Sequence, residues 1–209
     1  MSLADIVHIV DDDQSVRDSL CFLLESAGLA TRSHESAEAF LAVVGAEPIG
    51  CVLTDVRMPG TSGLELQTRL HALDVPAMVI VMTGHGEVPV AVAAMKNGAA
   101  DFLEKPFDDH QLLDAVQRAL AATRDARANE ARQSEAANRV ASLTPREREV
   151  LDGLIAGHGS KAIALRLGAS PRTIEVHRTR VMTKLGVRSL PELVRLAQTA
   201  GPPSAASAP

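Results

Sequence analysis

Several apolar segments of this chain end beside polar residues that could take part in phosphate chemistry. These residues are Asp11, Asp12 and Asp13 after segment 6–10, Asp55 after segment 51–54, Thr83 after segment 78–82, and Lys105 shortly after segment 101–103. Clustered carboxylates repel one another unless a cation joins them, and oxygen ligands with a single lysine nearby favour Mg²⁺ over zinc. A carboxylate beside such a metal can attack phosphorus, and a lysine can neutralise charge on the transferred group. The residue types therefore predict a magnesium site at which a carboxylate accepts a phosphoryl group.

The elements that would position these residues form a repeating strand–helix pattern. Short apolar segments that do not alternate with polar residues are typical of strands in a parallel sheet covered on both faces. The five predicted strands are Ile6–Val10, Leu29–Ser33, Cys51–Thr54, Met78–Met82 and Asp101–Leu103. Amphipathic segments predict helices at Ser15–Ala27, Ala37–Val44, Gly63–Leu73 and Pro89–Asn97, with a fifth from about Asp108. This order predicts an α/β doubly wound, five-stranded parallel sheet, in which the carboxyl ends of the strands share the edge where ligands bind.

Each of these polar residues also has a simpler interpretation when it is considered alone. Asp11–Asp13 could be a solvated loop that caps the next helix, and Asp55 could be a turn residue before Met58-Pro59-Gly60. Thr83 could be an ordinary strand-end threonine, and Lys105-Pro106 could be only a turn. Their coincidence at the ends of separate strands is what favours a shared site. The sequence contains no glycine-rich loop ending in Gly-Lys-Ser or Gly-Lys-Thr, so a nucleoside triphosphate is not the evident ligand.

The charge of the chain is divided between an acidic part and a basic part. Residues 1–120 contain 7 Lys and Arg against 18 Asp and Glu, a net charge of −11. Residues 143–209 contain 10 Lys and Arg against 5 Asp and Glu, a net charge of +5. An acidic half joined to a basic half suggests two tasks, with the basic half as the candidate for binding nucleic acid.

Composition places the chain among globular proteins and gives no sign of a membrane segment. Apolar residues make up 46% of the 209 residues, which is enough for packed cores. No apolar run approaches ~18 residues, and the N-terminus lacks a basic segment followed by an apolar one. Cys21 and Cys51 lie in apolar segments without CxxC spacing, which favours buried reduced thiols over a redox pair. We therefore expect a cytoplasmic protein without membrane contact.

The chain changes character after the fifth strand–helix unit. From Leu112 to Val140 it is rich in Ala, Arg and Glu and contains no Gly or Pro, which favours a long helix over a flexible charged tether. Thr144, Pro145 and Glu147 then predict a capped helix at the start of a new, all-α domain. We expect a first domain at 1–122, a helical linker at 123–141, a second domain at 142–200 and a disordered tail at 201–209.

Two short helices joined by a tight turn are predicted within the second domain. The first helix has an apolar face formed by Ala162, Ile163, Leu165 and Leu167. The turn is Gly168-Ala169-Ser170, and the second helix is expected to direct inward Ile174, Val176, Val181, Met182 and Leu185. The remaining positions of the second helix are mostly basic or hydroxyl-bearing, which suits contacts to phosphates and base edges in a major groove. A solvated helix of a small bundle is the alternative interpretation of this pattern.

Four motifs together resemble the receiver domain of bacterial response regulators. They are VDDD at 10–13, DVRMPGTSG at 55–63, MTGHG at 82–86 and FLEKPF at 102–107. The resemblance covers about residues 4–125 and implies that Asp55 accepts a phosphoryl group from a histidine kinase. It implies that the ligands of Mg²⁺ are Asp11, Asp12, Asp55 and the backbone carbonyl of Arg57.

The same resemblance assigns a switch to the opposite end of the pocket. Thr83 and Lys105 resemble the residues that contact the phosphoryl group, and Phe102 occupies the position of the switch aromatic residue. Asp13 is either a helix cap or an indirect support of the metal site, and the Lys105–Pro106 bond is cis in such domains. By resemblance, the contact face of a phosphorylation-dependent dimer includes Val88, Val92 and Lys96.

Residues 142–198 resemble the four-helix DNA-binding domain of LuxR-type regulators. With the receiver, they indicate a member of the NarL/FixJ family of response regulators, particularly of its FixJ-like branch. Thr173–Lys184 resembles the recognition helix, and the implied DNA contacts are Lys161, Arg172, Thr173, Glu175, Val176, His177, Arg178, Thr179 and Lys184. The segment Ser189–Thr199 resembles the terminal helix that makes dimer contacts on DNA, with Leu193 in the interface.

Within this set, Glu175 departs from the pattern, because many relatives have a basic residue there. An acidic side chain cannot contact phosphate, so it would either read cytosine or orient Arg178. Arg178 and Lys184 are expected to contact mainly phosphates, whereas the residues expected to face bases are Thr173, Glu175, Val176 and Thr179.

The expected function is a transcription regulator that a sensor histidine kinase switches, with an operator in double-stranded DNA and RNA polymerase as further partners. An aspartate-nucleophile phosphatase of the dehalogenase type is disfavoured, because such enzymes need a second carboxylate two residues after the nucleophile and this chain has Arg57 there. A constitutive DNA-binding protein with an inactive receiver is disfavoured because all the pocket residues are present. A regulator that senses a small molecule would not need an aspartate pocket. We expect no enzymatic activity beyond the receiver's own phosphorylation and dephosphorylation.

Overall fold

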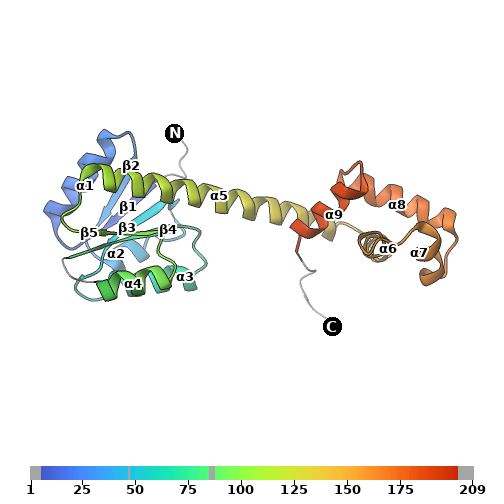
Figure 1. The fold of residues 1–209 in the computed structure, drawn as a ribbon, viewed down its shortest axis with the longest axis horizontal. Helices are drawn as coiled ribbons and strands as arrows, with labels where there is room; N and C mark the ends of the chain where they lie inside the picture. Colours follow the sequence, from blue (N-terminus) through green and yellow to red (C-terminus); the bar gives the residue numbers. More distant parts are fainter. Residues whose placement is uncertain (1–5, 47, 85–87, 202–209) are drawn as a thin grey trace. The chain divides into compact units, whose positions relative to one another are not determined.

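The computed structural model describes residues 6–46, 48–84 and 88–201, without the side chains of Val88 and Val90. The chain divides into two compact units, one that ends at Arg127 and one that begins at Ala128. Each unit is drawn in Figure 1 and is described by itself below. None of the helices in the described ranges is long and apolar enough to cross a membrane.

The first unit contains a five-stranded sheet in which every pairing is parallel. Its strands are β1 (Ile6–Val10), β2 (Ala30–His34), β3 (Cys51–Asp55), β4 (Met78–Thr83) and β5 (Asp101–Glu104). Their spatial order is β2-β1-β3-β4-β5. Strand β2 therefore lies on one side of β1, and β3, β4 and β5 follow one another on its other side. The predicted doubly wound sheet is confirmed, and the predicted strand limits differ from the observed limits by at most one residue.

Helices cover both faces of this sheet, as Figure 1 shows. On one face, α1 (Gln14–Ser26) and α5 (Asp109–Ala141) pack against strand residues such as Ile9 and Leu53. On the other face, α2 (Ala37–Leu41), α3 (Gly63–Ala72) and α4 (Val88–Lys96) pack against Val10 and Val52, which adjoin Ile9 and Leu53 in the same strands. Successive side chains of a strand point to opposite faces, which explains why continuous apolar strands were needed to fill both cores.

Helix α5 has 33 residues and continues without a break through the predicted domain boundary at residue 122. Thr123 is buried, and its Oγ1 accepts a hydrogen bond from Met78 N at 3.2 Å. Arg127 Nη2 donates to the carbonyl oxygen of Ile49 at 2.6 Å. These contacts attach residues 123–127, which the sequence had assigned to the linker, to the amino-terminal edge of the sheet.

Within the described residues, the second unit consists of the end of α5 and four further helices. These are α6 (Pro145–Ile155), α7 (Ser160–Leu167), α8 (Pro171–Leu185) and α9 (Leu190–Thr199). Ser170 accepts from Thr173 N at the start of α8, and Gly186 ends this helix in the left-handed conformation at φ +65°. Val150, Ile163, Ile174 and Leu185 are fully or almost fully buried in one core. The pair α7–α8 with its short turn is the predicted helix-turn-helix.

Three predicted side-chain orientations in this unit are wrong. Val176 is 46% exposed and Leu165 is 86% exposed, and Ala162 is also exposed. In a helix, Val176 lies about 200° around the axis from Ile174, so the two cannot both face the core. Ala164, rather than Ala162 or Leu165, packs beside Ile163. The predicted disordered tail, apart from Gly201, lies outside the described residues.

Candidate functional site

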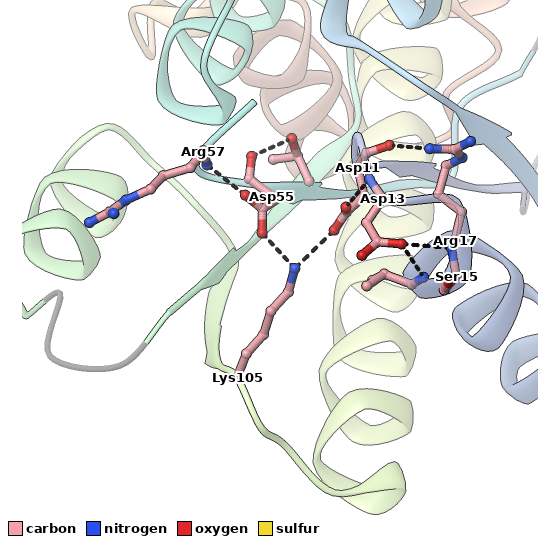
Figure 2. Close-up of polar contacts among 9 residues, drawn as sticks. Asp11, Asp13, Ser15, Arg17, Asp55, Arg57 and Lys105 are labelled. Atoms are coloured by element: carbon pink, nitrogen blue, oxygen red, sulfur yellow. Dashed lines mark hydrogen bonds and ion pairs between the residues drawn. The ribbon is translucent and has the colours of Figure 1, made fainter. Parts of the chain in front are cut away.

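The carboxyl ends of β1, β3 and β5 bring two carboxylates and one ammonium group together. Lys105 Nζ donates to Asp55 Oδ1 at 2.6 Å and to Asp11 Oδ2 at 2.9 Å, as Figure 2 shows. These three residues are separated in sequence by 50 and 94 positions, and the parallel sheet is what places them side by side. The structure therefore joins three of the residues that the sequence predicted for this site.

Asp55 is held at the end of β3 by its own backbone surroundings. Its Oδ2 accepts a hydrogen bond from Arg57 N at 2.6 Å, so the loop after the strand fixes the carboxylate orientation. Helix α3 begins directly against the strand, because a Cβ on Gly63 would lie 2.2 Å from the carbonyl oxygen of Asp55. Only glycine permits this approach. Gly63 therefore shapes the site. It is the last residue of the motif at 55–63, but a glycine has no functional group, so the sequence did not indicate this role.

Asp11 is the buried carboxylate of the site, with 2% of its side chain exposed. Its Oδ1 accepts from Asp13 N at 2.9 Å, and its backbone carbonyl accepts from Arg17 Nη1 at 2.8 Å. Asp13 is the N-cap of α1, since its Oδ1 accepts from Ser15 N at 2.8 Å. Asp13 was expected to be either a helix cap or an indirect support of the metal site, and the structure shows the helix cap.

Asp12 lies next to Asp11 but is exposed, and its side chain makes no hydrogen bond or ion pair with the residues that the structure describes. Among the described residues, no group of three or more His, Cys, Asp or Glu side chains converges on one metal position. The donor set nevertheless fits a hard cation. Asp11 and Asp55 lie within 3 Å of the same nitrogen, and all the candidate ligands are oxygen atoms. Mg²⁺ needs only one or two carboxylates and retains several waters, so Asp11 and Asp55 would suffice, and Asp12 would add a third carboxylate if its side chain turned inward.

The ammonium group of Lys105 is stabilised in its charged form. Its partial burial works against the charge, but the hydrogen bonds that Lys105 donates to Asp55 and Asp11 outweigh that effect and raise the pKa of Lys105 above its usual value. The lysine therefore stays protonated across physiological pH. A permanent cation within 3 Å of Asp55 is suited to binding phosphoryl oxygens on that carboxylate.

Thr83 and Phe102 lie on the side of the pocket that faces α4. Thr83 is buried at the end of β4, and its hydroxyl makes a long hydrogen bond of 3.4 Å to the carbonyl oxygen of Gly84. Phe102 on β5 is 41% exposed. The two residues line one apolar groove of about 470 Å³ between β5 and α4, together with Ala91, Val92, Met95 and Lys96. The aromatic side chain thus has space beside it, next to the predicted switch hydroxyl.

The Lys105–Pro106 peptide bond is cis, as the resemblance implied.

A contact that the sequence analysis missed fixes the loop between β3 and α3. Glu38, from α2, accepts a hydrogen bond from Thr61 N at 3.1 Å and another from the Thr61 hydroxyl. These hydrogen bonds lower the pKa of Glu38, the one from the Thr61 hydroxyl having the largest effect. The loop contains Arg57, whose carbonyl is a predicted metal ligand. Glu38 and Thr61 are 23 positions apart and match no local motif, so no sequence signal indicated this contact.

In the second unit, the exposed face of α8 contains most of the predicted DNA contacts. Those exposed are Arg172, Thr173, Glu175, Val176, Thr179 and Lys184, and Lys161 is exposed on α7. Arg178 and His177 are half-buried, and His177 Nδ1 is buried without a hydrogen-bond partner among the described residues. The exposed face of α8 therefore offers basic, hydroxyl and apolar groups along one side of the helix.

Lys184, near the end of α8, binds through its ammonium to another helix of the unit. Lys184 Nζ donates to Glu147 Oε2 at 2.7 Å, and the Glu147 side chain is only 4% exposed. Glu147 also completes the predicted capping box with Thr144 at the start of α6. The hydrogen bond from Lys184, followed by that from Thr144, lowers the pKa of Glu147 to about 2. This pair fastens the end of α8 to the start of α6.

The predicted dimer residues are placed differently from one another. Val92 is 47% exposed and Lys96 is exposed on α4, whereas the side chain of Val88 lies outside the described residues. Leu193 is fully buried in the core of the second unit, so its assignment to a dimer interface is wrong. The exposed apolar residue of α9 is instead Leu190, at 39% exposure.

Comparisons with known proteins match each unit to a family. Residues 7–117 match the response regulator receiver domain, and residues 141–197 match the bacterial regulatory proteins of the luxR family. The chain therefore belongs to the two-component response regulators that join a receiver domain to a LuxR-type DNA-binding domain, and it is a regulator of transcription. Receiver domains generally use a divalent metal for phosphorylation, and this class implies a kinase partner and DNA.

Among its relatives are proteins named FixJ. The chain is 55% identical to the transcriptional regulatory protein FixJ of Azorhizobium caulinodans over 195 residues, which cover 93% of this chain and 92% of that protein. It is 51% identical to FixJ of Bradyrhizobium diazoefficiens, over 93% of this chain and 95% of that protein. The predicted membership of the FixJ-like branch is thus confirmed.

Solved structures agree with the fold. The response regulator StyR is 42% identical and aligns with a TM-score of 0.83, over 92% of this chain and 98% of that chain. Full-length FixJ from B. japonicum is 50% identical and aligns with a TM-score of 0.60, over 96% of this chain and 98% of that chain.

Proposed function

We propose that a sensor histidine kinase phosphorylates Asp55 in a Mg²⁺-dependent reaction, and that the phosphorylated chain dimerises on a two-fold DNA operator. The observation that supports this proposal is the contact of one protonated lysine with both Asp55 and Asp11. On this proposal, catalysis is limited to the chain's own phosphoryl transfer and dephosphorylation. The second unit contacts DNA, and RNA polymerase is the further partner at the promoter.

The phosphoryl transfer needs a nucleophile, charge neutralisation and a leaving group. A carboxylate oxygen of Asp55 forms the bond to phosphorus, and the bond from phosphorus to the kinase's histidine nitrogen breaks. The electron pair of the broken bond stays on that nitrogen, and because the other ring nitrogen of the phosphohistidine carries a proton, the histidine leaves as a neutral imidazole. Lys105, already within 2.6 Å of Asp55, neutralises charge on the phosphoryl oxygens. Mg²⁺ held by Asp11, Asp12, Asp55 and the carbonyl of Arg57 would supply further positive charge to the same oxygens.

The kinase must approach the pocket over a neighbouring surface, and α1 offers an apolar one. Phe22 is 77% exposed and borders a groove of about 580 Å³ with Leu20, Leu23 and Phe107. Phe107 lies two residues after Lys105, so this groove adjoins the loop that delivers the lysine. An exposed aromatic residue in a groove next to this loop is the kind of residue that anchors a protein partner. We assign the kinase to this groove.

The switch begins with the charge of about −1.5 to −2 that phosphorylation adds beside Lys105. The Thr83 hydroxyl, which lies 3.4 Å from the carbonyl oxygen of Gly84, turns toward the new oxygens. Phe102 then rotates into the groove beside Thr83, which changes the surface of α4 and β5. The exposed apolar residues on that surface are Val92, Met95 and Phe102, at 47%, 46% and 41% exposure. Two copies paired there would bury this apolar area.

Dimerisation of the receivers would increase DNA binding without new contacts to the bases. Pairing two DNA-binding units raises the effective concentration of the second unit at a two-fold operator. Arg178 would contact phosphates, and Thr173, Val176 and Thr179 would face bases. The DNA-binding units would meet through the exposed residue Leu190 of α9, in place of Leu193. The alternative is that phosphorylation only uncovers the recognition helix.

Intact-mass measurement after incubation with acetyl phosphate tests the acceptor assignment. The chain should gain one base-labile phosphoryl group only when Mg²⁺ is present, and Asp55→Asn should gain none at this site. Asp12→Ala should need a higher Mg²⁺ concentration, because it removes a ligand. Equal labelling of Asp55→Asn at the same position would show that another residue accepts the phosphoryl group.

A further inference from the structure

Glu175 is the only acidic residue of α8, the helix proposed to enter the major groove. The same helix contains Arg172, Arg178, Arg180 and Lys184. A carboxylate on a surface that approaches phosphates opposes binding by charge alone. Its presence on the exposed face is explained if it makes a positive contribution, and a hydrogen-bond acceptor makes one toward a donor on the DNA.

The Glu175 side chain is held by two contacts that both use the same oxygen. Ser160, the first residue of α7, donates its hydroxyl to Glu175 Oε1, and Arg178 Nη1 lies 3.8 Å from that atom. Within the described ranges, Oε2 has no hydrogen-bond donor, while 56% of the side chain is exposed. Two groups from two helices thus restrict the rotation of the carboxylate and leave one oxygen available. A fixed acceptor discriminates between donors better than a mobile one, because less freedom is lost on binding.

The place of Glu175 on α8 suits contact with a base edge. It lies in the second turn, on the same side as Arg172 and Thr179, which are three residues before it and four after it. Recognition helices reach base edges with residues near their N-termini. Val176, next along the chain and 46% exposed, is an apolar neighbour suited to a thymine methyl group.

The major-groove pattern of each base selects the partner of such an acceptor. Cytosine presents its N4 amino group as a donor, whereas guanine and thymine present acceptors that repel a carboxylate. Adenine presents a donor beside an acceptor, which suits the amide of Asn or Gln better than a carboxylate. We infer that Glu175 reads the amino group of one cytosine in each half-site, and that Ser160 and Arg178 are positioning residues. This inference rests on the proposed binding of α8 in the major groove.

Selection from a pool of randomised DNA duplexes by the full-length, acetyl-phosphate-treated chain tests the inference. The wild-type chain should enrich cytosine at one position of each half-site, by roughly 5- to 150-fold over the other bases. Glu175→Gln should change the preference at that position from cytosine to adenine and leave the other positions unchanged. Ser160→Ala should keep cytosine preferred but reduce its enrichment, because Oε1 loses its donor.

Glu149→Gln is the matched control, because Glu149 is an exposed acidic residue of α6 that pairs with Arg146 at 2.8 Å. It removes the same charge from the same unit and should enrich the wild-type sequences. If Glu175→Gln also enriches the wild-type sequences, only more tightly, Glu175 acts through charge alone and the inference is overturned. If the wild-type chain enriches no sequence, the proposed DNA binding fails, and the inference fails with it.

Discussion

Replacing Lys105 with methionine separates the role of the ammonium from that of the metal. Lys105→Met keeps an apolar chain of similar length but removes both hydrogen bonds, at 2.6 Å to Asp55 and 2.9 Å to Asp11. Loss of one positioned charge at a transferring group slows such reactions by about 10²- to 10³-fold, or roughly 2.7–4 kcal/mol. The labelling rate with acetyl phosphate should fall by about that factor even when Mg²⁺ is saturating.

The same substitution should change stability in a way that depends on metal. Without Lys105, the Asp11 carboxylate, only 2% exposed, faces Asp55 without a cation. Removing one member of a buried ion pair costs about 3–5 kcal/mol, and a discount for the 29% exposure of the Lys105 side chain reduces this to about 2–3 kcal/mol. Mg²⁺ should restore part of that loss, since it replaces the missing positive charge and no longer competes with the ammonium.

Initial labelling rates by intact mass, and urea unfolding by circular dichroism with and without Mg²⁺, measure both effects. Fluorescence is unsuitable because the chain has no Trp or Tyr. Lys161→Met is the matched control, since Lys161 is exposed on α7 in the other unit, and it should label at the parent rate. A labelling rate of Lys105→Met within about threefold of the parent would refute the role assigned to the ammonium.

Three further outcomes follow from the structure. The Glu147 pKa is about 2 in the folded chain and about 4.3 in unfolded chains, so the second unit should lose stability as pH falls from about 4.3 to 2, and Glu147→Gln should flatten that part of an unfolding series. If Glu147→Gln had the same pH dependence of stability as the parent, the Glu147 carboxylate and its contact with Lys184 would not be the cause of the loss of stability. Phe22→Glu should slow phosphotransfer from the cognate kinase but leave acetyl-phosphate labelling unchanged. If both reactions slowed, Phe22 would be needed for the structure of the receiver rather than for docking of the kinase. The phosphorylated parent should sediment as a dimer at tens of micromolar, roughly −6 kcal/mol, and Val92→Arg should remain monomeric while it is labelled normally. A dimeric Val92→Arg would exclude the α4–β5 face.

The arrangement of the pocket was predictable because it follows from the topology of a parallel sheet. Once β1, β3 and β5 were identified as parallel strands, their carboxyl ends had to meet, and Asp11, Asp55 and Lys105 stand at those ends. The hydrogen-bond partners of the lysine could not be predicted, because they depend on how far each loop carries its side chain.

Other features depend on the phase of a helix or on packing between distant segments. Val176 could have been placed correctly by counting 100° per residue from Ile174, whereas its apolar character suggested the core. Leu193 could not have been placed correctly from the sequence, because the periodicity of α9 fits either a core or an interface. The Lys184–Glu147 pair joins residues 37 positions apart and requires the packing of α6 against α8.

The DNA affinity of the full chain, measured before and after treatment with acetyl phosphate and Mg²⁺, tests most directly whether phosphorylation of Asp55 controls DNA binding. An operator obtained by the selection described above would be titrated with the parent and with Asp55→Asn under both conditions. Phosphorylation should tighten binding of the parent and should have no effect on Asp55→Asn. The proposed switch would be contradicted if the untreated parent bound the operator as tightly as the treated one, or if Asp55→Asn responded to the treatment as the parent does.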